Sequence, residues 1–99
     1  MAKYILTNKA VGDLSGIWNY TSDVWSEVQA DKYYFMLLES FQELADGEVA
    51  GKNYTAIKEG LFGFKIGQHI IFYRKAKNHV IEITRILHNR MDLKNRIPE

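Results

Sequence analysis

The chain has 99 residues, enough for one domain, and its 13 Lys and Arg nearly balance its 12 Asp and Glu, which leaves a formal net charge of +1. This balance gives no bulk-charge signal for nucleic-acid binding, and a hydrophobic fraction of 46% excludes a disordered chain. The lack of cysteine excludes disulfides and thiolate metal sites. No apolar run suits a signal peptide or a membrane span, so we expect a cytoplasmic protein without membrane contact.

The chain is expected to begin with a strand and a helix. Residues 4–7 form a short apolar run that predicts a strand. Thr7 or Asn8 can accept a hydrogen bond from the first free N–H groups of a helix, so a helix is expected to start there. Gly12 and Gly16 each weaken this helix by roughly 1 kcal/mol relative to alanine, so it depends on tertiary packing. Apolar positions recur in it at spacings of three and four, at Ala10, Leu14, Ile17, Thr21 and Val24.

A second helix is expected to follow at once. Ser26 and Gln29 match the spacing of a capping box, which predicts a helix start. Gly47 can take the left-handed conformation that commonly ends a helix. Because the break between the two helices is short, they should form an antiparallel helical hairpin.

The second half of the sequence is predicted to be mainly β. Residues 54–58 suggest a short irregular strand, and residues 61–66, 69–75 and 80–87 predict three longer strands joined by hairpins. These strands should form a three-stranded antiparallel meander, covered on one face by the helical hairpin and partly open on the other. The fold class is therefore α+β, in a single domain spanning 1–99 with a tail from about 93 that cannot continue the sheet, because Pro98 lies in it.

Charge is unevenly distributed along the chain. From Phe72 onward, basic residues outnumber acidic ones, which favours an acidic partner lying against the C-terminal strands. The basic residues are Arg74, Lys75, Lys77, Arg85, Arg90, Lys94 and Arg96, against Glu82, Asp92 and Glu99.

The last predicted strand and its end carry polar groups of interest. Simple alternation places Arg85 on the same face as Ile81, Ile83 and Leu87, so its guanidinium must be paired or reach water; a structural ion pair and a binding role both remain open. His69 and His79 lie at hairpin ends, where solvated turn histidines are expected.

Two further groupings have alternative interpretations. His88, Arg90 and Asp92, with a hydroxyl such as that of Tyr73, include residue types used in phosphodiester chemistry, although no carboxylate pair or metal-ligand spacing accompanies them. Aromatic residues also gather in the predicted helices, where helical spacing suggests core packing and base stacking is the alternative. They are Trp18, Tyr20, Trp25, Tyr33, Tyr34 and Phe35.

An ordered set of short motifs resembles the ParE branch of the RelE/ParE superfamily of bacterial toxins. The set begins with the strand 4–7 and the spacing Ala10-x-x-Asp13-Leu14-x-x-Ile17, followed by Trp25 and Gln29-Ala30-x-x-Tyr33. It continues through Ile57-x-x-Gly60-Leu61, Gly67-x-His69-x-Ile71-Phe72-Tyr73-Arg74 and Arg85-Ile86-Leu87-His88-x-x-Met91-Asp92. The resemblance spans nearly the whole chain, and its final block is the most specific.

The resemblance implies a toxin of a type II toxin–antitoxin system that inhibits DNA gyrase by binding it, rather than an enzyme. It implies neutralisation by a ParD-type antitoxin and, through that antitoxin, contact with operator DNA. The alternative is a ribosome-dependent mRNA endonuclease of the RelE type. We expect a target-binding surface and no catalytic residue, cofactor or metal. The residues of that surface are Lys65, Arg74, Arg85, His88, Arg90 and Asp92.

The sequence departs from the nuclease branch at two places. Nucleases of the superfamily commonly carry arginine directly after the histidine of the middle strand, where this chain has Ile70, and the last strand ends without a terminal tyrosine. Loss of a cation that stabilises developing charge costs on the order of 3 kcal/mol, by analogy with oxyanion donors. The pattern therefore favours binding over bond cleavage.

Overall fold

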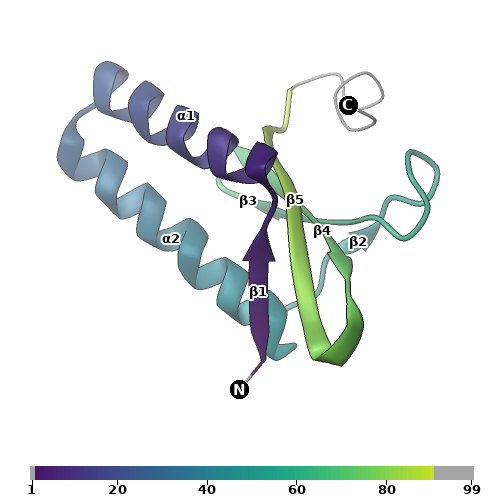
Figure 1. The fold of residues 1–99 in the computed structure, drawn as a ribbon. Coiled ribbons are helices and arrows are strands. Elements are labelled where there is room, and N and C mark those ends of the chain that lie inside the picture. Colours follow the sequence, from purple (N-terminus) through teal and green to yellow (C-terminus); the bar gives the residue numbers. More distant parts are fainter. Residues whose placement is uncertain (1, 91–99) are drawn as a thin grey trace.

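The computed structural model describes residues 2–90, and in it a helical hairpin packs against one face of a β-sheet (Figure 1). The predicted α+β class is confirmed. In chain order the elements are β1 (Lys3–Leu6), α1 (Asn8–Val24), α2 (Glu27–Asp46), β2 (Lys52–Asn53), β3 (Phe62–Ile66), β4 (His69–Lys75), one 3-10 turn (Lys77–His79) and β5 (Val80–His88).

The helix boundaries follow the predicted local signals. The Thr7 side chain accepts a hydrogen bond from the Ala10 amide at 3.1 Å and so begins α1. Ser26 accepts one from the Gln29 amide at 3.1 Å and begins α2, which ends at Gly47 in the left-handed conformation with φ of 77°. Each of these caps satisfies backbone groups that a helix end leaves without an intrahelical partner.

The sheet has five strands in the order β1-β5-β4-β3-β2, and the predicted meander forms its centre. β1 pairs with β5 in parallel, while the other pairs are antiparallel, so the sheet is mixed. The connection that this parallel pairing requires runs through the helical hairpin and the strands β2, β3 and β4. The tail predicted from about 93 lies outside the described residues.

The predicted strand at 54–58 is wrong, because that segment forms a turn. The Ile57 and Lys58 amides both donate back to the Tyr54 carbonyl, at 2.9 and 3.1 Å, so they are not available to a neighbouring strand. The short strand β2 lies just before this turn, at Lys52–Asn53. The apolar side chains that suggested a strand instead pack onto a second hydrophobic cluster on the sheet.

A register shift in β5 changes the predicted faces of that strand. Ile83 lies opposite Tyr73, but the next paired residue is Arg85, opposite Phe72, so Thr84 is an additional residue on β5. One extra residue reverses the alternation of side chains beyond it. The prediction that Arg85 shares a face with Ile81 and Ile83 is therefore wrong.

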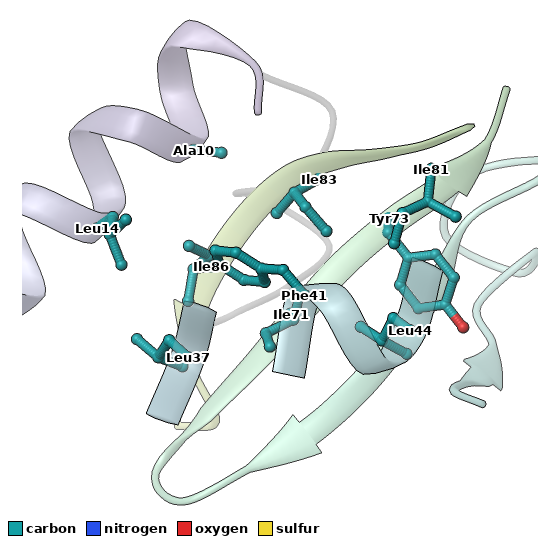
Figure 2. Packing of buried hydrophobic residues seen from close by; sticks show 10 residues of the cluster. All are labelled: Ala10, Leu14, Leu37, Phe41, Leu44, Ile71, Tyr73, Ile81, Ile83 and Ile86. Carbon is teal, nitrogen blue, oxygen red and sulfur yellow. The ribbon is translucent and has the colours of Figure 1, made fainter. Parts of the chain in front are cut away.

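The main core lies between the helices and the sheet (Figure 2). Phe41 and Leu37 of α2 are fully buried there, together with Ile71 and Ile83 of the sheet. A smaller cluster, formed by Leu61, Ile70, Phe72 and Leu87 with Tyr54 and Ile57 packed against it, occupies the opposite face. The turn after β2 thus covers part of the face that we expected to be open.

Candidate functional site

A groove of about 930 Å³ lies between α1, the first turns of α2 and the neighbouring ends of β4 and β5. We call it the hairpin groove. Its apolar lining comes from Ile17, Tyr20 and Trp25 on the helical hairpin and from Ile86 and Leu87 on β5. The groove therefore joins residues from both ends of the sequence.

Two aromatic residues of the groove are largely exposed, Trp25 at 74% and Tyr20 at 66%. Of the other predicted helical aromatics, Tyr33 and Tyr34 pack against the main core and the Trp18 indole N–H donates to Asp31 at 2.9 Å. Phe35 is exposed but does not line the groove. Core packing thus accounts for only part of the predicted cluster. Large exposed aromatic side chains in a groove are typical of protein-binding surfaces.

An ion pair between Asp13 and Arg85 forms one polar wall of the groove. The Asp13 carboxylate accepts hydrogen bonds from the Arg85 Nε at 2.8 Å and its NH2 nitrogen at 3.0 Å. It also accepts the Ile86 amide at 2.9 Å. Of the two roles left open for Arg85, the structure provides the ion pair.

Tyr33 and His69 form a second polar feature of the groove. The Tyr33 hydroxyl lies 2.7 Å from His69 Nδ1 and accepts the Gln68 amide at 3.1 Å. The direction of this hydrogen bond is set by the His69 tautomer: the hydroxyl donates to an unprotonated Nδ1 and accepts from a protonated one. Burial raises the pKa of Tyr33, which keeps this hydroxyl protonated.

His69 is not the solvated turn histidine that we expected. Burial and the neighbouring charge of His88 lower its pKa to about 4, against a smaller opposing effect of Asp13. The His69 and His88 rings meet edge to face with centroids 5.4 Å apart. His79, by contrast, is exposed in the β4–β5 turn, as predicted.

The structure brings together some of the predicted surface residues and separates others. Arg85 and His88 line the hairpin groove, and exposed Arg90 follows directly, its amide donating to His88 Nδ1 at 3.1 Å. Lys65 is exposed on β3, opposite Ile70 and next to the His69 pair. Asp92 lies outside the described residues.

Arg74 and Tyr73 lie towards the other end of the sheet. Arg74 pairs with Glu82 at 3.3 Å, and Glu82 precedes His88 by six residues, or about 20 Å of strand. Tyr73 is buried and its hydroxyl accepts the Gly51 amide at 2.9 Å, so the suggested combination of Tyr73 with His88 does not form.

Asp13, Tyr20 and Tyr33 line the groove but were not predicted as site residues from the sequence. Asp13 and Tyr33 stood within the family-like motifs, but nothing local connected them with β5 or the β3–β4 turn. Within residues 2–90, no group of three or more His, Cys, Asp or Glu side chains is arranged to hold a metal ion. Neither helix of that region is long and apolar enough to cross a membrane.

The depressed pKa of His69 predicts a loss of stability in mild acid. An unfolded histidine has a pKa near 6.5, so below that value the unfolded chain binds a proton more readily than the folded chain does. The contribution of His69 is therefore complete above pH 6.5 and declines as the pH falls towards 4. Thermal melts between pH 7.5 and 4.5 should show a smaller decline for His69→Gln than for the natural protein. Equal declines would contradict a half-buried His69 with a lowered pKa.

Comparisons with known proteins identify relatives over nearly the whole chain. The model of the family described as ParE toxin of type II toxin-antitoxin system, parDE, matches residues 4–93. Toxin ParE1 of Mycobacterium tuberculosis is 32% identical over 93% of this chain and 94% of its own length. Toxin ParE of Escherichia coli is 32% identical over 100% of this chain and 96% of its own. A solved structure titled as a chromosomal ParDE system from P. aeruginosa aligns with a TM-score of 0.72 at 22% identity, covering 89% and 96% of the two chains.

Proposed function

We propose a molecular target for this chain, which belongs to the ParE toxin family of type II toxin–antitoxin systems. The parDE pairing implies that this toxin has a ParD antitoxin as its partner. We propose that the toxin acts in the cytoplasm by binding DNA gyrase, without breaking a covalent bond itself. The family match over residues 4–93 is the observation that carries this proposal.

The surroundings of Ile70 support binding rather than RNA cleavage. Ile70 stands where nucleases of the superfamily commonly carry arginine, and it is buried in the second hydrophobic cluster with Phe72 and Leu87. A charged side chain at this position would lose hydration without a partner, which is costly. The position is thus adapted to packing in this chain.

The end of β5 is our candidate for the gyrase-binding surface. His88 and exposed Arg90 lie there, and Lys65 is exposed on β3, which β4 separates from β5. The Arg90 and Lys65 cations favour carboxylates of a protein or phosphates of DNA held by it, and hydrogen bonds to charged groups are the stronger ones. Asp92 remains part of the predicted surface.

We propose that the ParD antitoxin occupies the hairpin groove. The groove combines exposed Trp25 and Tyr20 with the aliphatic side chains of Ile17, Ile86 and Leu87. An amphipathic helix or extended segment that places apolar side chains in such a groove would cover both aromatics. Because the groove reaches His88, the antitoxin would also approach the proposed gyrase-binding surface.

The test is a titration of purified toxin into gyrase supercoiling and DNA-cleavage assays. We expect supercoiling to fall and cleaved DNA to accumulate, with both effects reversed by added antitoxin. The control variant is Lys9→Ala, which replaces an exposed residue of α1 that does not line the groove. Unchanged gyrase at saturating toxin would overturn the proposed target. Transcript cleavage in a translating extract, abolished by His88→Ala, would instead establish the endonuclease.

A further inference from the structure

The end of β5 lacks a neighbouring strand on one side within the described residues. The parallel pairing of β1 ends at Leu6 opposite Ile83, whereas β5 continues to His88. Thr7 then leads the chain into α1: its amide donates to the Ile83 carbonyl at 3.0 Å, and its hydroxyl donates to the Thr84 carbonyl at 2.8 Å. Beyond Thr84, α1 rather than a strand lies beside β5.

Asp13 supplies the hydrogen-bond acceptor that a neighbouring strand would otherwise give this part of β5. Its Oδ2 accepts the Ile86 main-chain N–H at 2.9 Å, as a carbonyl of a neighbouring strand would. The same carboxylate holds Arg85 through two nitrogens, at 2.8 and 3.0 Å. Both side chains are only 15% exposed, so water competes weakly for these bonds.

We propose that Asp13 is a positioning residue for toxicity: through Arg85 and the Ile86 amide, it fixes the end of β5 that presents His88 and Arg90. The inference rests on the proposed function in that it places the toxic surface at this strand end. Of the two roles that the sequence left open for Arg85, it assigns the ion pair in place of direct contact with the target, because the guanidinium bonds Asp13.

Two observations connect the ion pair to the strand end rather than to stability alone. The Thr84 register shift immediately precedes Arg85, at a place where the regular ladder alone does not fix the strand. Three residues further, the His88 ring contacts the His69 ring, and His88 accepts the Arg90 amide. A displacement of Ile86 would therefore be transmitted to His88 and Arg90.

The contact and positioning roles of Arg85 predict different results in a double-mutant cycle. If Asp13 positions β5 through Arg85, Asp13→Ala, Arg85→Ala and the double variant should lose toxicity to a similar extent, at least about tenfold each, because coupled residues are not additive. If Arg85 contacts the target directly, Asp13→Ala should leave toxicity intact, since the guanidinium itself is retained.

Toxicity is best measured as growth arrest over a range of expression levels, a readout that assumes no particular target. Ile81→Val is the control, since it perturbs the opposite end of β5, where Ile81 is 7% exposed. Asp13→Asn is the second variant, because its amide oxygen can still accept the Ile86 N–H while the charge for Arg85 is lost; we expect an intermediate loss. Amide exchange should show faster exchange at Ile86 in Asp13→Ala, with Ile81 unchanged.

Several outcomes would overturn the proposal. They are full toxicity of Asp13→Ala, losses that add in the double variant, unchanged exchange at Ile86, or an equal loss in Ile81→Val at a matched melting temperature. If gyrase proves not to be the target, growth arrest and amide exchange still test Asp13. Failure of the proposed target and failure of the positioning role are thus distinguished.

Discussion

Replacing Phe41 by alanine is expected to lower the free energy of unfolding by about 3–5 kcal/mol, the largest loss that we predict for this protein. Phe41 is fully buried in the main core, and its ring meets the Tyr4 ring edge to face, with the two ring centroids 5.5 Å apart. Alanine would remove this contact and leave a cavity between α2 and the sheet. In a domain of this size the melting temperature should fall by at least about 12 °C, measured by circular dichroism.

Phe35→Ala is the matched control for this prediction. Phe35 lies on the same helix but is 64% exposed, so its removal should change the free energy of unfolding by less than about 0.5 kcal/mol. A loss for Phe41→Ala no larger than that of Phe35→Ala would contradict the core position of Phe41. Added antitoxin should partly restore the melting temperature of Phe41→Ala, since a ligand that binds only the folded state stabilises it.

Replacing Trp25 by alanine is expected to weaken antitoxin binding about 30-fold or more, which corresponds to at least about 2 kcal/mol. Trp25 lines the hairpin groove while 74% of its surface is exposed, so a partner that fills the groove would bury a large indole there. Because the free toxin gains little from this side chain, its melting temperature should hardly change. Isothermal titration calorimetry with purified antitoxin measures the affinity.

Phe35→Ala serves again as the control, because Phe35 is a comparably exposed aromatic residue that does not line the groove. We expect its antitoxin affinity to match that of the natural toxin. An equal loss for both variants would show that exposed aromatics contribute generally, and full affinity of Trp25→Ala would place the antitoxin outside the groove.

The candidate site could be predicted from sequence only in part. The last strand and its His88 and Arg90 followed from pattern and from the family resemblance, and the chain does carry them at a strand end. The residues of the opposite wall of the groove could not be predicted from the sequence. Asp13 is 72 residues from Arg85 and Tyr33 is 36 residues from His69, and no local pattern encodes such pairings.

The sequence by itself determined the features that arise within a few residues. Thr7, Ser26 and Gly47 marked the helix ends, because a cap needs only a side chain or a left-handed residue beside the orphan backbone groups. The two turns of the β3–β4–β5 meander followed for the same reason, and hairpins fix antiparallel neighbours.

Only the tertiary structure decided the rest. The parallel pairing of β1 with β5, the extra residue at Thr84 and the turn after β2 depend on how segments far apart in sequence share one core. The 54–58 side chains were apolar enough for a strand, yet packing on Phe72 required a turn. Local propensity is weak compared with the burial of apolar side chains, so the register, and with it the position of Arg85, was set by packing.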